Sequence, residues 1–383
     1  MLHLSVTRSA NWKVHVLRNR AESGGRAPAS ADEAVVRVVE MLPMKSELWH
    51  SPACYFNTAL RGIPPLTSVA AAQRTINMWS RGELDWKKWL DETDAIRSEF
   101  ALLIGVEPAR VGVGHTTAAL VNVVAANVQS NSRVLIPEGE HNSNTIPFAA
   151  QRHRGITIDS APLGDLAAAI RPHHAVVALS LVQSFDGAIA DLSNISGQCR
   201  RHGALLCLDL TQAAGWLPFD PGLADILVCS SYKWLMGPNG PAFIVLRESL
   251  VQSFRQLQPN WFACADRNAA PYGMEFPAAI SASRYDVVPG LISASALLPS
   301  LTLINQVGIP TIHRHNTQLA AALCARLDIA HNGSAIVVTD TPDAARKLQA
   351  RNIRATVRGD RVRLAIHIYN NMDEIELLAK VLS

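Results

Sequence analysis

A carboxylate and an amine each follow an apolar run of the sequence. Asp209 comes directly after residues 204–208, and Lys233 follows the next run, residues 224–229. Such runs are typical of buried parallel strands, so both side chains are expected at strand carboxyl ends, where open α/β sheets bind ligands. A lysine there can form a Schiff base with an aldehyde, and a carboxylate can keep a ring nitrogen protonated. The pair therefore predicts a pyridine cofactor that carries an aldehyde.

Neither residue is specific on its own, because a single lysine after a strand is usually solvated and a single aspartate often caps a helix. The ordered pattern is more informative. Asp209 and Gln212 come first, a second apolar strand follows, and then come Ser230, Tyr232 and Lys233. This order resembles the class V aminotransferase branch of fold-type I pyridoxal-phosphate enzymes. The branch includes cysteine desulfurases, kynureninases and isopenicillin-N-epimerase-like proteins.

The resemblance implies that the cofactor is pyridoxal 5'-phosphate. Lys233 would then carry the Schiff base, and Asp209 would pair with the ring nitrogen. The family places a glutamine or histidine at the position of Gln212, where it bonds the ring oxygen. Ser230 and Tyr232 are predicted to bind the cofactor as well.

Thr116 and Thr117 stand where a strand or loop runs into an apolar helix, residues 118–128. Two hydroxyls and the free N–H groups of a helix start form an anion site, because the helix dipole points the same way. A plain threonine cap is an equally good interpretation of the motif alone. The family resemblance places the cofactor phosphate at these two threonines.

His141 belongs to a Glu-His-x-x-Asn-x-x-Pro pattern formed by Glu140, His141, Asn144 and Pro147. The resemblance puts His141 where a residue stacks on the pyridine ring, and an imidazole there can also move protons. The alternatives are a solvated loop histidine and a shift of register to Asn142.

Arg363 is the predicted clamp for a substrate carboxylate, since a guanidinium binds a carboxylate through two parallel hydrogen bonds. It resembles the arginine of the family's C-terminal signature, although Ala365 replaces a serine. His367 lies on the same face of an extended strand and is either a second polar group of the site or a satisfied core histidine. Asn57 loosely matches a family segment that enters the site near the substrate.

The elements that position these residues are an alternation of apolar strands and helical stretches, which predicts an α/β protein with a mostly parallel sheet covered on both faces. The resemblance specifies a fold-type I enzyme with a seven-stranded sheet. Residues 1–55 are predicted to form an N-terminal arm and a helix that packs on the small domain. Residues 56–288 would form the large cofactor-binding domain, and residues 289–383 a small C-terminal α+β domain. The predicted sheet strands are 132–137, 155–160, 175–180, 204–208, 224–229 and 241–246, and residues 111–117 are expected to run as strand or loop into the helix that follows.

Composition excludes several classes of protein. The chain is 48% hydrophobic and 17% charged, with a net charge of +3. It contains no dense run of lysine and arginine, so the sequence does not predict a nucleic-acid partner. The uncharged stretch 291–309 contains Pro299 and many polar residues, which favours a core helix over a membrane span. Six scattered cysteines and the lack of an apolar signal core near the N-terminus favour a reducing, cytoplasmic location.

The predicted reaction acts at Cα and Cβ of an amino-acid substrate. Residues 353–360 are short and lack the cysteine that cysteine desulfurases carry there, which argues against a persulfide mechanism. The first choice is a β-eliminating C–S lyase on a cysteine S-conjugate in specialised metabolism, in which His141 could protonate the leaving thiolate. A decarboxylating deaminase, an epimerase, an aminotransferase and a catalytically silent binding protein are the alternatives. The fold type predicts a homodimer, although Val288 and Pro289 replace the family's Gly-Thr pair.

Overall fold

The computed structural model describes residues 48–50, 54–267, 272–275 and 277–383. They belong to one compact unit, Met44–Ser383. Most of residues 1–55, for which an N-terminal arm and a helix are predicted, lies outside the described residues. The boundary predicted between residues 288 and 289 stays a prediction.

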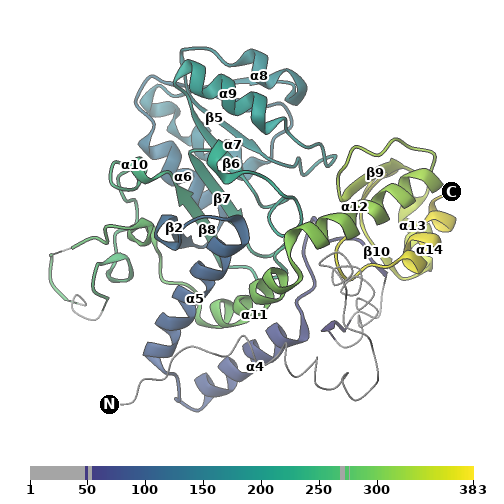
Figure 1. Ribbon diagram of the computed structural model, residues 1–383, viewed down its shortest axis with the longest axis horizontal. Helices are drawn as coiled ribbons and strands as arrows, with labels where there is room; N and C mark the ends of the chain where they lie inside the picture. The colour runs from purple at the N-terminus through teal and green to yellow at the C-terminus, as the bar shows by residue number, and fades with distance from the viewer. Residues whose placement is uncertain (1–47, 51–53, 268–271, 276) are drawn as a thin grey trace, which may run out of the picture. The chain divides into compact units, whose positions relative to one another are not determined.

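A seven-stranded sheet forms the centre of the fold (Figure 1). Its strands lie in the order β2-β8-β7-β6-β5-β3-β4, and only β8 runs against the others, so the predicted mostly parallel sheet is confirmed. The strands are β2 (Val111–Gly114), β3 (Arg133–Pro137), β4 (Thr157–Ala161), β5 (His174–Ser180), β6 (Leu205–Asp209), β7 (Ile226–Ser230) and β8 (Ala242–Leu246).

Both faces of this sheet are buried, each in its own hydrophobic core. In β5, Val177 and Leu179 belong to one core, whereas Val176 and Ala178 belong to the other. Successive side chains of a strand point to opposite faces, so a strand that is covered on both sides must be apolar throughout. This explains why the inner strands β5, β6 and β7 read as mainly apolar runs, with polar residues at their carboxyl ends, whereas the edge strand β4 is polar and only partly buried.

Helices cover the two faces, and α11 packs along α4 and α5 (Figure 1). The α-helices of the described residues are α4 (Leu66–Ser80), α5 (Trp86–Ile104), α6 (Thr117–Asn127), α7 (Asn142–Ala149), α8 (Leu166–Ala169), α9 (Leu192–His202), α10 (Glu248–Val251), α11 (Leu291–Val307), α12 (Ile309–Arg326), α13 (Ala344–Ala350) and α14 (Met372–Leu382). In the described part of the chain no single helix has the length and hydropathy to span a membrane, although the sharply bent pair α11 and α12 meets both criteria together.

The C-terminal part contains two small sheets. One consists of β9 (Ile336–Asp340), β11 (Thr356–Arg358) and β12 (Arg361–Ala365) in the order β11-β12-β9. The other pairs β1 (Cys54–Tyr55) with β10 (Ile353–Arg354) in parallel. The chain changes sheets at Ala355, because β10 pairs with β1, far earlier in the sequence, whereas β11 forms a hairpin with β12.

Candidate active site

Lys233 follows the carboxyl end of β7 and is almost completely buried. Its backbone is fixed by a close approach of Gly62, where an added Cβ would lie 2.0 Å from the Lys233 carbonyl oxygen. The Gly62 N–H also donates to the Tyr232 carbonyl oxygen at 2.9 Å. Burial lowers the pKa of the Lys233 amine to about 8. A substantial fraction of this amine is therefore neutral, and able to act as a nucleophile or a base, near pH 8.

Asp209 is the last residue of β6, the strand that neighbours β7. It is buried, and its Oδ1 accepts a hydrogen bond from the Thr211 N–H at 2.8 Å. Burial raises the pKa of Asp209 to about 6, while the bonds from Thr211 and the positive charge of Lys233 act in the opposite direction. The carboxyl group is thus mainly ionised at pH 7.

A cluster of three hydroxyls lies at the start of α6. The Thr117 hydroxyl is 2.8 Å from the Ser230 hydroxyl and 3.1 Å from that of Thr211, and the Thr117 N–H donates to Ser230 Oγ. Thr116 caps the helix by accepting from the Ala119 N–H at 3.1 Å. The sequence analysis missed Thr211. A hydroxyl two residues beyond a strand-end aspartate is the signal that could have revealed it.

Glu140 holds the loop that carries His141. Its carboxylate accepts hydrogen bonds from the Ser180 N–H at 2.7 Å, the Ser180 hydroxyl at 2.6 Å, the Gln183 amide at 3.0 Å and the His141 N–H at 2.7 Å. The loop after β3 is thereby tied to the end of β5. The exposed His141 ring accepts from the Ser143 N–H through Nδ1, and desolvation together with the charge of Lys233 lowers the pKa of this imidazole. His141 is therefore neutral at pH 7.

Gln212 connects the two strand ends to the C-terminal part. Its Nε2 donates to the Ala59 carbonyl and to Ser184 Oγ, each at 3.0 Å, and its Oε1 accepts from Trp234 Nε1 at 2.8 Å. Ser184 in turn accepts from Arg363 Nη1, at 3.0 Å on its hydroxyl and also on its carbonyl oxygen. A continuous chain of hydrogen bonds thus runs from the segment after β6 to β12.

Arg363 is half-buried, and its Nη2 lies 3.4 Å from Thr356 Oγ1, which itself donates to Asn57 Oδ1 at 2.6 Å. Asn57 therefore stands behind Thr356 and contacts the arginine only through it. Burial and the nearby charge of Arg358 lower the pKa of the Arg363 guanidinium. Its Nε is buried without a hydrogen-bond partner among the described residues.

His367 lies in the core. It is completely buried, with its Nε2 2.9 Å from the Trp234 carbonyl oxygen and its Nδ1 3.4 Å from Asn316 Nδ2. Burial lowers the pKa of this imidazole to about 3. The expectation that His367 binds substrate is therefore corrected: it is the satisfied core histidine of the two alternatives, because the chain after β12 turns inward against Trp234.

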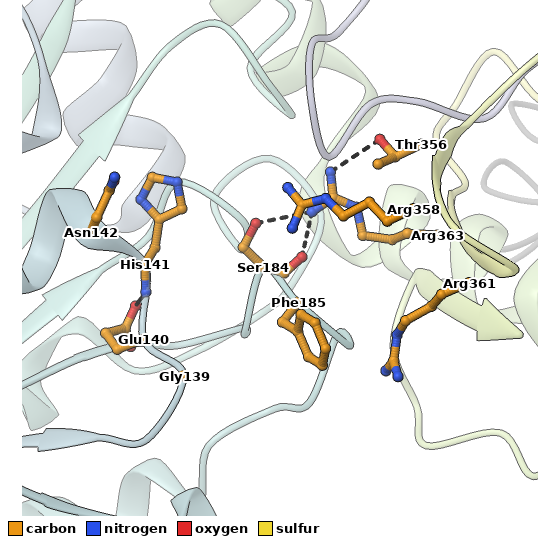
Figure 2. A pocket seen from close by; sticks show the side chains of 10 residues that line it. All are labelled: Gly139, Glu140, His141, Asn142, Ser184, Phe185, Thr356, Arg358, Arg361 and Arg363. Atoms are coloured by element: carbon orange, nitrogen blue, oxygen red, sulfur yellow. Dashed lines mark hydrogen bonds between the residues drawn. The ribbon is translucent and has the colours of Figure 1, made fainter. Parts of the chain in front are cut away.

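Two cavities meet at this place. The first, the lysine cavity, has a volume of about 250 Å³ and is lined by Lys233. The second, of about 330 Å³, is the arginine cavity, which has His141 on one side, three arginines on the other, and Ser184 with Phe185 between them (Figure 2). His141 and Ser184 line both, so the cavities adjoin. All eight residues predicted to bind the cofactor line the lysine cavity: Thr116, Thr117, His141, Asp209, Gln212, Ser230, Tyr232 and Lys233. Arg363 lines the arginine cavity, whereas Asn57 and His367 line neither.

The model of the family "Aminotransferase class-V" matches residues 84–370, a span that contains both cavities. The chain belongs to the class V aminotransferase family. An uncharacterized aminotransferase of Bacillus subtilis, YcbU, is 26% identical over 313 residues, which cover 76% of this chain and 83% of that protein. A probable cysteine desulfurase of Methanothermobacter thermautotrophicus is 23% identical over 333 residues, covering 75% and 82%. Among solved structures, the cystine C–S lyase C-DES superposes with a TM-score of 0.78 at 20% identity, covering 87% of this chain and 98% of that one.

This class V enzyme uses pyridoxal 5'-phosphate, the cofactor to which glycine is covalently linked in a structure of a C-DES mutant with the same fold. The residues of the lysine cavity fit that group. A buried amine of lowered pKa is available for the aldehyde, and a buried, ionised carboxylate is available for the ring nitrogen. The start of α6, with the hydroxyls of Thr117 and Ser230 beside it, suits a phosphate.

Proposed function

We propose that this class V enzyme is a C–S lyase that acts by β-elimination on a cysteine S-conjugate. The observation that carries the proposal is the set of groups around the two cavities. Lys233 and His141 can move protons there, whereas none of the six cysteines, all of which lie in the described part of the chain, is among the lining residues. A desulfurase would need a thiolate above the substrate sulfur. Cys324, in α12, is buried, and burial raises the pKa of its thiol.

The residues of the lysine cavity are assigned to the cofactor. Lys233 would hold it covalently, Asp209 would pair with its ring nitrogen, and His141 would cover its ring. The Gln212 amide would give up its hydrogen bond to Ser184 and donate to the ring oxygen of the cofactor instead. The phosphate would lie at Thr116, Thr117 and Ser230, with Tyr232 beside it. Arg363 would bind the substrate carboxylate through its two terminal nitrogens.

The bound cofactor supplies an electron sink for the bond that breaks at Cα. With its amine free, Lys233 would take the Cα proton, for which its lowered pKa suits it. The expectation that His141 donates the proton to the leaving thiolate needs refinement, because an imidazole of lowered pKa is a weak source of protons at pH 7. The Lys233 ammonium formed in the first step is the better donor. One cysteine conjugate and one water then give one thiol, one pyruvate and one ammonia.

The other reactions considered start from the same geometry and differ in the bond that breaks. A decarboxylating deaminase would release carbon dioxide, an epimerase would invert Cα, and an aminotransferase would produce a keto acid with transfer of the amine. The buried Lys233 and Asp209 pair argues against a silent binding protein, which would not need the amine. A homodimer in the cytoplasm and a role in specialised metabolism remain part of the proposal.

The test is a product assay with the purified holoenzyme. A panel of cysteine conjugates and free amino acids is incubated, and thiol, pyruvate, ammonia, alanine and carbon dioxide are measured. We expect thiol and pyruvate in equal amounts and no alanine. The Cys324→Ser variant should be as active as the wild type, since that thiol lies outside both cavities.

Stoichiometric alanine from free cysteine would overturn the proposal in favour of desulfuration. Carbon dioxide with an aldehyde would favour the decarboxylating deaminase instead. Loss of activity in Cys324→Ser, with an unchanged melting temperature, would also contradict the assigned mechanism.

A further inference from the structure

The hairpin of β11 and β12 presents a row of cations on one face. In its register, Thr356 pairs with Arg363 and Arg358 pairs with Arg361. Residues two apart in a strand share a face, and directly paired residues of neighbouring strands share it as well. All four side chains therefore line the arginine cavity, opposite His141 (Figure 2).

None of the three arginines, Arg358, Arg361 and Arg363, has an ion pair among the described residues, and Arg363 alone has hydrogen bonds to side chains, those of Ser184 and Thr356. Neither Arg358 nor Arg361 makes a hydrogen bond or an ion pair to a side chain within the described part of the chain, and Arg361 Nε is buried without a partner. Asp340 is opposite Arg361 in β9, but no ion pair joins them. The Arg361 guanidinium lies instead over the Phe185 ring, 4.3 Å from its centroid. This contact holds the guanidinium at the cavity wall.

The acidic residue that lines the arginine cavity makes no ion pair with any of the described arginines. Glu140 already accepts hydrogen bonds from Ser180, Gln183 and the His141 backbone on the other side of the cavity. Like charges paired directly across two strands repel one another, so the Arg358–Arg361 pair costs the protein stability when no anion is present. An arrangement of this kind favours a ligand with more negative charge than one carboxylate.

We propose that the substrate is an amino acid whose side chain ends in an oxyanion, bound by Arg358 and Arg361, while Arg363 holds the α-carboxylate. The inference rests on the proposed function, because it takes the lysine cavity as the place where the substrate amine reacts. It narrows the substrate class to acidic amino acids and acidic cysteine conjugates. A carboxylate, a sulfonate and a phosphonate share the chemistry that two guanidiniums recognise.

The first experiment uses the wild-type holoenzyme and ligands that have no leaving group at Cβ. Isothermal titration calorimetry compares L-glutamate with L-glutamine and L-aspartate with L-asparagine, pairs of equal size that differ in charge. We expect at least one acid to bind about tenfold or more tightly than its amide, as hydrogen bonds to charged groups are typically worth that much. L-Homocysteate and L-2-amino-4-phosphonobutyrate identify the preferred oxyanion. Raising the NaCl concentration should reduce the preference.

The second experiment tests whether Arg358 and Arg361 cause the preference for the acid over its amide. Arg361→Gln and Arg358→Gln should each reduce the ratio of acid to amide affinity severalfold, because the charged side chain loses more than its amide does while the α-carboxylate clamp stays intact. The matched control is Arg351→Gln, an exposed arginine of the same part of the chain that lines neither cavity. The melting temperature of each variant verifies folding, and the wild-type salt series tests the preference without any variant.

Equal affinity for every acid and its amide, or a preference that survives in both variants, would overturn the inference. Failure of the proposed function has a different signature. In that case reduction with borohydride would leave no cofactor on Lys233, or no thiol would be released from any conjugate, whatever the acid preference found by calorimetry.

Discussion

The lysine cavity and the arginine cavity adjoin but are built on opposite principles. In the first, Thr117, Thr211 and Ser230 satisfy one another through hydrogen bonds, so the walls are complete before any ligand binds. In the second, Arg358 and Arg361 have neither ion pairs nor hydrogen bonds to side chains among the described residues. The difference teaches that a preorganised wall of hydroxyls that satisfy one another suits a cofactor that stays, whereas an uncompensated charge suits a ligand that comes and goes. Four predictions test this contrast.

The largest effect is expected from Lys233→Ala. Without the amine, neither covalent attachment nor proton transfer at Cα is possible, and turnover should fall by on the order of a thousandfold or more. Mass spectrometry after borohydride reduction should find the cofactor on Lys233 in the wild type and on no residue in the variant. The control is Lys380→Ala, at an exposed position of α14. A label on another lysine would assign the lysine cavity a different role.

Asp209→Asn should lower turnover by on the order of a hundredfold while most of the cofactor stays bound. A neutral amide cannot keep the ring nitrogen protonated, but the hydroxyl cluster and Lys233 remain in place. Steady-state kinetics and the visible absorbance of the holoenzyme measure the two quantities separately. Full activity of Asp209→Asn would mean that Asp209 only accepts a hydrogen bond from the Thr211 N–H and takes no part in turnover.

Arg363→Ala should weaken binding of an amino-acid substrate by about 1.5–3 kcal/mol, the typical cost of losing hydrogen bonds to a charged group. Cofactor affinity should change less, because Arg363 lines the arginine cavity and not the lysine cavity. Arg363→Lys should restore little, since an ammonium lacks the planar fork. Titrations with substrate and with cofactor check both halves of the prediction. Normal substrate binding by Arg363→Ala would mean that another residue binds the substrate carboxylate.

The smallest effect concerns pH. Covalent attachment of the cofactor requires the neutral amine, and the pKa of Lys233 is lowered to about 8 by burial. The rate of attachment to the apoenzyme should therefore rise as the pH passes through about 8 and level off above it. Asp209→Asn should move the midpoint to lower pH, because the carboxylate stabilises the ammonium. Rapid-mixing absorbance measurements over a pH series test this. A midpoint near that of an ordinary lysine would mean that the amine is solvated in the apoenzyme.

The sequence by itself determined most strands of the central sheet and the eight residues predicted to bind the cofactor, but not Thr211. Apolar runs buried on both faces leave little choice of structure, and polar residues at their carboxyl ends must meet at one edge of the sheet. Asp209 and Lys233 were predictable for this reason, and so were the threonines at the start of α6.

Only the tertiary structure decided what depends on partners far apart in the chain. Whether His367 faces a cavity or the core depends on what packs against it. It lies in the core because its ring contacts the Trp234 carbonyl oxygen. Glu140 positions its loop because it accepts a hydrogen bond from Ser180 at the end of β5. The chain divides into β10 and β11 at Ala355 because β10 pairs with β1. The row of arginines was visible as residue types, but only the register of β11 with β12 placed Arg358 beside Arg361 on one face. Packing and the pairing of strands far apart in the chain depend on the whole fold, and no local pattern encodes them.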